Sequence, residues 1–478
     1  MLNENEILKF INEDKASIRK YNAKVGQNYY DGIHDILKYR MFYFNSDGLL
    51  VEDNTRSNIK IPHPFFTELV DQTVQYMLSN TDDNFIKSDI PELQSELDYY
   101  FDDNFISELA DTLTGTQSKG FEYMYAYMNS DGKLSFQCAD SLGVIEIRAK
   151  ETNDNCDYII YYYKERVTKD NKIITKVQVW DENQTYFYIM DDGKLIPDSG
   201  EPLNPRPHVI YKKENDESIY YDNFGFIPFF RLDNNKNKTS ALNPIKDLID
   251  DYDIMSCGLS NNLIDFDHPL HVVKGFQGDN LDELQQNLKT KKMIGVDSDG
   301  GVEVHTVNIP YDARLAKLNE DEKNIYRFGM GFNSTQLGDG NITNVVIKSR
   351  YALLDLKCNK LEIRLKQFLK KIVEVVIDEI NKENDTDYKI TDVYFNFIRE
   401  VMTNAEDNAN IEKIDAEKRR IVVETLLGLQ GIIDNDTIRK NICDTLELNY
   451  DDVKNKLPED ELLSNANALD SIGGVLIE

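Results

Sequence analysis

Three long stretches of this chain repeat apolar residues at the three- and four-residue spacing of an amphipathic helix. They cover residues 243–266, 310–328 and 344–384, with polar residues at the intervening positions. The third would be ~60 Å long at ~1.5 Å per residue, whereas an average globular helix has only ~11–12 residues. The pattern therefore predicts a molecule organised around long helices.

The first of these helices has a predicted start and two different sides. Asn243 followed by Pro244 is typical of a capping side chain with a proline in the first turn. Its apolar residues form one stripe, so we expect the acidic residues to face water on the other side. These acidic residues are Asp247, Asp250, Asp251 and Asp253.

The residues before position 116 also carry a helical pattern. Apolar residues recur at helical spacing within 61–78, and an amphipathic stretch follows over 91–113. We therefore predict that this amino-terminal part is helical and that its apolar residues pack into an ordinary core.

Between residues 121 and 230 the pattern changes to short segments rich in β-branched and aromatic residues. Turn-forming sequences at 129–132, 168–171 and 191–194 separate several of them. This arrangement predicts an antiparallel meander, folded either as a sandwich or as a small barrel, followed by a polar linker before residue 243. Together with the helices, it predicts an α+β fold.

A compact segment of mixed character lies between the first two long helices. We expect a strand at 271–276, a short helix at 281–291 and a tight hairpin that turns at Asp297–Gly301. A segment of this size is too small to fold comfortably alone, so packing against identical neighbours would help to stabilise it. A second polar segment, at 329–344, contains four glycines and separates the last two long helices.

Charge and cysteine content narrow the classes of function. The chain has 85 acidic and 54 basic residues, a formal net charge of −31. Because static binding of DNA depends on cationic groups that neutralise phosphates, such a chain could surround a duplex that slides but would not hold one tightly. Its five cysteines are scattered singly, which favours a reducing compartment. No signal peptide or membrane-spanning run is evident, so we expect a soluble protein without membrane contact.

No catalytic motif stands out in the sequence. There is no phosphate-binding loop of the nucleotide-hydrolase type. Asp267, His268 and His271 could in principle hold a metal, but Pro269 constrains their geometry. The loop that starts at Asp233 lacks the glycine and glutamate of a calcium-binding loop. We therefore predict no catalytic residue, no metal and no cofactor.

The order of these features resembles the portal proteins, or head–tail connectors, of tailed bacteriophages. The type concerned occurs in long non-contractile-tailed phages of Gram-positive hosts. The resemblance rests on YYDGIHDILKYR at 29–40, IPHPFFTELVDQTVQYML at 61–78, GFIPFFRLDNN at 225–235 with the helix after it, and the helix–loop–helix at 310–380. Each motif is only moderately specific, but they occur in the family's order across essentially the whole chain.

The resemblance implies a ring of twelve copies, or thirteen in isolated assemblies, around a tunnel at one capsid vertex. Double-stranded DNA would be packaged and ejected through that tunnel. The implied partners are the terminase large subunit, then the head–tail adaptor, and also the major capsid and scaffolding proteins. The implied regions are a wing at 1–241 (helical at 1–115, β-rich at 116–241), a stem helix at 242–266, a clip at 267–309, a second stem helix at 310–328, a tunnel loop at 329–344, a long wing helix with its return at 345–400, and a crown at 401–478.

The tunnel loop supplies the expected site residues. Small polar side chains and flexible glycines suit a loop that touches phosphates without gripping them. The DNA-facing residues would be Asn333, Ser334, Thr335, Gln336 and Asn341. Lys348 and Arg350, just past the loop, are candidates for weak phosphate contact, although salt bridges to a neighbouring subunit would explain them equally well.

Two other classes of function remain open at this point. An acidic, metal-dependent nuclease or hydrolase would require carboxylates that converge on one pocket. Another structural protein of the virion, such as a tail-tube component, would be mostly β, and the long helix pair argues against that.

Overall fold

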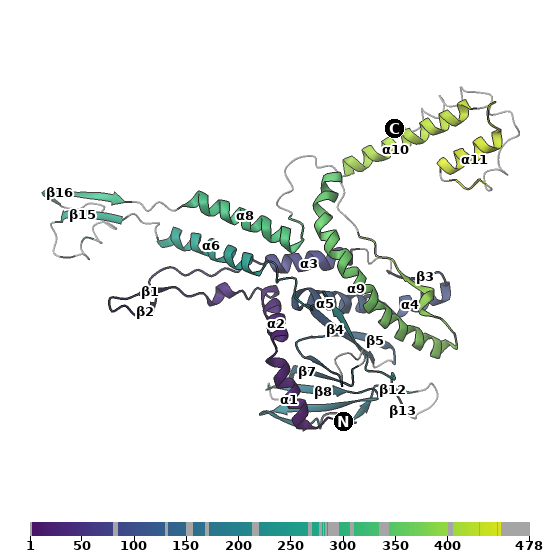
Figure 1. The fold of residues 1–478 in the computed structure, drawn as a ribbon, viewed down its shortest axis with the longest axis horizontal. Helices are drawn as coiled ribbons and strands as arrows, with labels where there is room; N and C mark the ends of the chain where they lie inside the picture. The colour runs from purple at the N-terminus through teal and green to yellow at the C-terminus, as the bar shows by residue number, and fades with distance from the viewer. Residues whose placement is uncertain are drawn as a thin grey trace. The chain divides into compact units, whose positions relative to one another are not determined.

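Figure 1 presents the computed structural model of the chain. It describes residues 2–79, 85–129, 132–149, 156–167, 172–212, 219–265, 270–276, 280, 282, 284, 296–305, 310–333, 344–399, 405–429, 431–446 and 448–450. The chain divides into two compact units. One contains residues 1–337 and 350–400, and the other contains residues 338–349 and 401–478.

The amino-terminal part is mostly helical, as predicted, but it also contains short strands that were not predicted. Its helices are α1 (Glu4–Lys15), α2 (Ile18–Tyr30), the short η1 (Asp35–Lys38), α3 (Phe65–Met77), α4 (Pro91–Tyr100) and α5 (Asp103–Lys119). Three strands interrupt them, namely β1 (Phe42–Phe44), β2 (Leu50–Glu52) and β3 (Ile86–Ser88). The stretch predicted at 91–113 is two helices, because α4 ends at its C-cap Phe101 and the Asp102 side chain caps α5 by accepting from Phe105 N.

The predicted meander is present as an open antiparallel sheet. Its strands pair in the order β10–β9–β8–β7–β6, and β11 pairs with the first two residues of β9. A separate three-stranded sheet has the order β14–β4–β5. The bounds are β4 Phe121–Met128, β5 Leu134–Ala139, β6 Val144–Ile147, β7 Tyr158–Val167, β8 Lys172–Trp180, β9 Gln184–Asp191, β10 Lys194–Pro197, β11 Arg206–Pro207, β12 Val209–Lys212, β13 Ile219–Asp222 and β14 Phe229–Asp233.

The two sheets share a core. Tyr123 on β4, Ala139 on β5, Ile159 on β7 and Trp180 on β8 belong to one buried cluster, together with Ala23 of α2. A second cluster joins Ile7 and Ile11 of α1 to the meander. Residues 234–239, predicted to be a linker, instead form a hydrogen-bonded turn, in which the side chain of Asn235 contacts the backbone and hydroxyl of Thr239.

The longest helix, α9, has the predicted bounds, Asn344–Asn384. One face of it is buried, including Leu361, Leu365, Ile372 and Ile380. Near its end, Glu383 accepts a hydrogen bond from Tyr100 on α4. The chain then returns through η4 (Ile390–Asp392) and β17 (Val393–Phe395), which pairs with β3.

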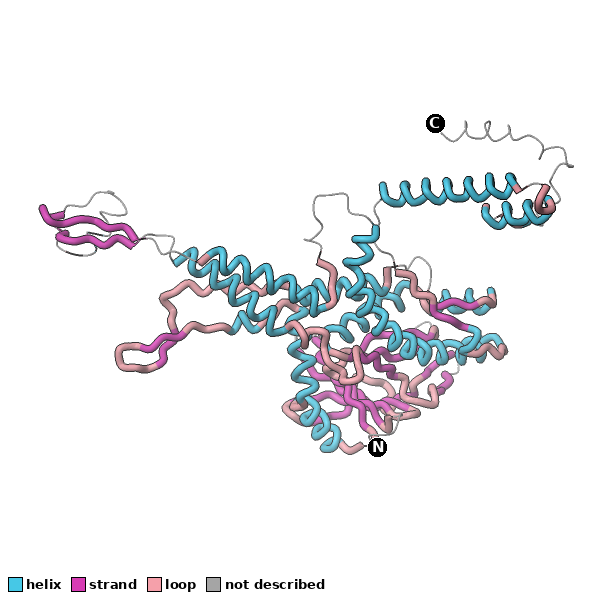
Figure 2. Tube along the Cα trace, turned by 45° about the horizontal axis from the view of Figure 1, so that its top comes forward, coloured by secondary structure: helices cyan, strands magenta, loops and turns pink. Residues whose placement is uncertain are grey.

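Helices α6 (Lys246–Asp265) and α8 (Tyr311–Gly329) lie side by side, as Figures 1 and 2 show. The predicted start of the first helix was too early: Asn243 and Pro244 lie in a turn, where Lys246 N already bonds to Leu242 O. Residue 266, the predicted end, lies outside the described residues.

Strands β15 (Leu270–Phe276) and β16 (Val296–His305) form an antiparallel pair between α6 and α8 in the chain. The predicted hairpin turn at Asp297–Gly301 was wrong, because these residues lie within β16. Lys274 pairs with Gly301, and a register shift follows before Phe276 pairs with Val296. Glycine and aspartate here accompany a bulge rather than a turn. Most of the predicted helix at 281–291 lies outside the described residues.

The second compact unit contains α10 (Ala405–Gly428) and α11 (Asn435–Thr445), which pack against each other. Asp434 caps α11 by accepting a hydrogen bond from Thr437 N at 2.9 Å. No helix among the described residues of either unit is long and apolar enough to cross a membrane.

Candidate functional site: the joint that holds the α6–α8 pair

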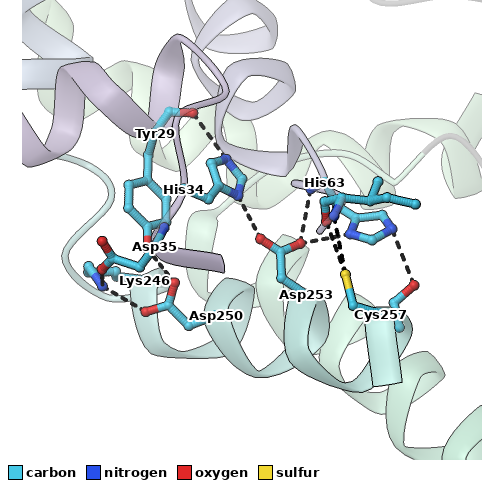
Figure 3. Close-up of polar contacts among 10 residues, drawn as sticks. Tyr29, His34, Asp35, His63, Lys246, Asp250, Asp253 and Cys257 are labelled. Atoms are coloured by element: carbon cyan, nitrogen blue, oxygen red, sulfur yellow. Dashed lines mark hydrogen bonds and ion pairs between the residues drawn. The ribbon is translucent and has the colours of Figure 1, made fainter. Parts of the chain in front are cut away.

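The base of α6 is held by a buried carboxylate. The Asp253 side chain contacts His34 Nδ1 through Oδ2 and His63 Nδ1 through Oδ1, each at 2.7 Å (Figure 3). Its Oδ1 also accepts the backbone N–H of His63 at 2.9 Å. Neither Asp253 nor His34 is exposed to solvent. The prediction that Asp253 faces water was therefore wrong.

The electrostatics of Asp253 follow from these contacts. Burial alone would raise the pKa of the Asp253 carboxyl, but hydrogen bonds from His34 and His63 outweigh burial and lower it. The carboxylate is thus ionised and fully engaged. Because His34 comes from the segment after α2 and His63 from the segment before α3, one side chain of α6 joins three parts of the chain.

A second polar group lies one turn earlier on α6. Lys246 Nζ contacts Asp250 Oδ2 at 2.7 Å and Asp35 Oδ2 at 2.8 Å, and the Tyr29 hydroxyl donates to Asp250 (Figure 3). Burial would lower the pKa of the Lys246 ammonium, but these carboxylates raise it. The Tyr29 ring also stacks on His34, with centroids 4.5 Å apart, so the two polar groups form one continuous joint.

An extended segment lies along α6 in a regular register. The backbone N–H groups of Ser57, Ile59, Ile61 and His63 donate to the side chains of Asp265, Asn261, Cys257 and Asp253, respectively. Two residues of extended chain advance ~6.6 Å, and four residues of helix advance ~6 Å. Every second residue of the extended segment therefore lies beside every fourth residue of α6. We call residues 57–63 the strap.

Aromatic and ionic contacts hold α8 in turn. The Phe65 ring lies edge-on to Tyr252 of α6 and Tyr326 of α8, with centroids 4.8 and 6.0 Å away. The Tyr326 hydroxyl donates to Glu68 of α3 at 2.6 Å. Between the two helices, Lys317 of α8 bridges Asp251 of α6 and the buried Asp321. The pair is therefore fixed both to the body and internally.

The chain is also fixed where it leaves α8. Met330 adopts a left-handed conformation that ends the helix. Gln72 of α3 then accepts from Phe332 N at 2.9 Å and donates to Phe332 O at 2.8 Å. The Phe332 ring stacks on Tyr351 of α9 at 4.5 Å. Lys357 Nζ reaches the Gly329 carbonyl at 3.3 Å, and burial lowers the pKa of its ammonium to about 8.

Few of the predicted site residues lie within the described part of the chain. Asn333 donates to Glu322 of α8 at 3.0 Å. Ser334, Thr335, Gln336 and Asn341 lie outside the described residues. Lys348 is exposed and Arg350 is half-buried, both in the first two turns of α9. Positions two apart do not share a helix face, so the two side chains leave α9 in different directions.

The joint residues were not predicted, although the sequence contains one signal for them. Asp253 lies in line with the buried Ile249 and Cys257, four positions away on either side. A carboxylate in such a line requires a buried partner. His271, considered earlier as a metal ligand, lies on β15, while 267–269 lie outside the described residues. Within the described ranges, no three His, Cys, Asp or Glu side chains are arranged to hold a metal ion.

Comparison with known proteins identifies the class to which this fold belongs. The family model of phage portal proteins of the SPP1 Gp6-like type matches residues 8–447. The portal protein of Bacillus phage SPP1 is 28% identical over 347 residues, which cover 72% of this chain and 67% of that protein. The portal protein of Clostridium phage phiCD119 is 24% identical over 436 residues, 85% of this chain and 88% of that protein.

The chain belongs to the phage portal protein family, in its SPP1 Gp6-like branch. The resemblance found in the sequence is thereby confirmed, and both relatives come from phages of Gram-positive hosts. Its function is that of a portal, a structural component of the virion, and this agrees with the expectation of a non-enzymatic role.

Proposed function

We propose that copies of this chain associate side by side into a closed ring at one capsid vertex. Double-stranded DNA passes through the ring during packaging and ejection. We take the ring to contain twelve copies, or thirteen in isolated assemblies. Assembly takes place in the host cytoplasm, where major capsid and scaffolding proteins surround the ring.

The exposed apolar side chains of the α6–α8 pair support this proposal independently of family membership. The α6–α8 pair is anchored to the body by the joint around Asp253, yet it leaves large apolar side chains exposed along its length. These are Ile254, Leu263, Ile264, Tyr311, Leu315 and Phe328. A single chain gains nothing from fixing a helix pair rigidly while these apolar side chains meet water, whereas neighbouring copies would cover them.

The regions take their roles from this arrangement. We assign α6 and α8 to the stem, residues 1–241 and 345–400 to the wing, and 401–478 to the crown. The clip, at 267–309, is the docking site for the terminase large subunit and afterwards the head–tail adaptor. The tunnel loop spans 329–344, and its anchored start at Phe332 supports a loop that is fixed at its base.

Net charge suits the passage of DNA. At −31 per chain, a ring would present an acidic bore that repels phosphates and lets the duplex slide. Within the loop, Asn333, Ser334, Thr335, Gln336 and Asn341 are our candidates for passing contact with DNA. Lys348 and Arg350 are the candidates for weak phosphate contact. The described residues contain nothing that favours the nuclease alternative.

The test begins with the purified full-length chain. Negative-stain images should contain rings with a central hole, and native mass spectrometry should give a mass of twelve or thirteen copies. Protein that stays monomeric at high concentration would contradict the proposal.

A second test addresses the loop alone. Asn341→Asp adds one negative charge per copy to the loop, and Asn183→Asp adds the same charge to an exposed loop between β8 and β9. We expect phage complemented with the loop variant to package less DNA while its rings assemble normally, and the control to package normally. Equal packaging by both variants would refute the loop assignment.

A further inference from the structure

The hairpin formed by β1 and β2 exposes apolar side chains on both of its faces. Phe42, Phe44 and Leu50 lie on one face, because Phe44 pairs with Leu50 and alternate residues share a side. They are 52, 73 and 60% exposed. Tyr43 and Val51, a directly opposed pair, lie on the other face and are also exposed.

This hairpin is nevertheless well specified by its sequence. The Asn45 side chain accepts the backbone N–H groups of Asp47 and Leu49 at 3.0 and 2.9 Å. Gly48 supplies the positive φ of 74° that the turn requires. However, two strands of three residues are marginal by themselves in water, and no third strand pairs with them within the described part of the chain. The turn therefore specifies the hairpin, but the hairpin needs further packing contacts to be stable.

The hairpin is also held in a fixed direction. Its second strand leads through Asp53 into the strap, and the strap is hydrogen-bonded to α6 at four successive points. Asp53 N returns to Met41 O at 2.8 Å, which closes the base of the hairpin. These contacts hold the hairpin in one orientation. A segment that docks on a partner benefits from this, because less conformational entropy is lost on binding.

We propose that the β1–β2 hairpin is an arm that docks on the α6–α8 pair of a neighbouring copy of this chain. The inference rests on the proposed ring. The strap meets α6 first at Asp265, where Ser57 is bonded, and the hairpin precedes the strap in the chain. The same end of α6 carries the exposed Leu263 and Ile264. Two apolar surfaces of one chain, both fixed and both uncovered, cover each other once the next copy is placed beside it.

The first test compares matched substitutions in the full-length protein. Phe44→Glu places a charge on the arm, and Ile173→Glu makes the same kind of change at an exposed position of β8. Burial of one phenylalanine is worth roughly 10- to 100-fold in association. We expect Phe44→Glu to raise the concentration of half-assembly, measured by mass photometry, by about that factor. The Ile173→Glu control should assemble like the wild type, and both variants should keep the wild-type circular dichroism spectrum.

The second test locates the contact. Phe44 is replaced by the photo-crosslinking residue p-benzoylphenylalanine, and isotopically heavy and light copies are mixed before assembly. We expect heavy–light crosslinks from position 44 to peptides of α6 or α8. Crosslinks confined to one chain, or Phe44→Glu rings that form at wild-type concentration, would overturn the docking arm while leaving the ring intact. Wild-type protein that never assembles would overturn both proposals.

Discussion

The Asp253 carboxylate and the His34 imidazole lie 2.7 Å apart, and neither side chain has any solvent exposure. His63 occupies the second carboxylate oxygen, so one acidic residue on α6 joins two separate segments of the chain. A buried carboxylate is costly unless hydrogen bonds compensate for its lost hydration. Here the compensation comes from the same contacts that position the helix pair.

Asp253→Asn should therefore destabilise the protein strongly. The amide has lost the charge and can accept from only one of the two imidazoles through its single oxygen. Breaking a buried, hydrogen-bonded pair typically costs about 3–5 kcal/mol. We expect a clear fall in Tm at fixed protein concentration. Asp247→Asn, a change of the same kind at an exposed position of α6, should leave Tm within a degree or so.

The same contacts predict a specific dependence on pH. The pKa of Asp253 is lowered from its ordinary value of 3.8, so its contribution to stability is present above 3.8. That contribution is lost as the pH falls through the lower folded pKa. The Tm difference between the wild type and Asp253→Asn should stay constant from neutral pH down to about 4 and shrink below it. A difference that is unchanged at pH 3 would contradict this assignment.

Gly115→Ala should be destabilising although it replaces glycine by the best helix former. A Cβ atom at residue 115 of α5 would overlap the carboxylate of Glu122. That carboxylate cannot move aside easily, because it is buried and contacts both Lys119 and Ser141 N. Overpacking of this kind costs ~1–3 kcal/mol, more than the ~1 kcal/mol that alanine gains in helix propensity.

A matched glycine gives the control for this prediction. Gly428 ends α10, and a Cβ atom there meets nothing within 4 Å. Gly428→Ala should be neutral or slightly stabilising when the unfolding free energies of both variants are measured by urea titration. If both substitutions stabilised the protein, α5 and β4 would have to be less tightly packed than the structure indicates.

Local pattern was sufficient for the long helices and for most strands between residues 121 and 230. The bounds of α9 follow from its apolar repeat, and β4 follows from eight residues of aromatic and apolar character bounded by turns. The β1–β2 hairpin was missed because it lies between helices and its strands have only three residues. The alternation around Asn45–Gly48 was nevertheless a usable signal.

The joint could not have been predicted from spacing alone. His34 and Asp253 are 219 positions apart, and only the folded chain brings them together. The acidic residues of α6 looked equivalent in the sequence, yet Asp247 is exposed while Asp253 is buried. Which face of a helix is covered depends on other segments, here the strap, whose own sequence is neither helical nor clearly stranded.

Asn261→Ala should release the strap from α6 at one point. Asn261 Oδ1 accepts the backbone N–H of Ile59 at 2.7 Å, in the middle of the register. Without that acceptor, the amide of Ile59 should exchange with solvent about fivefold faster, as expected for the loss of one hydrogen bond of ~1 kcal/mol. Hydrogen exchange followed by mass spectrometry of peptides covering 53–63 would measure this. Asn262→Ala, at the next position on the same helix, keeps the register intact and should leave the exchange unchanged. Equal protection in both variants would mean that the strap is held by its flanking contacts and not by the regular match between extended chain and helix.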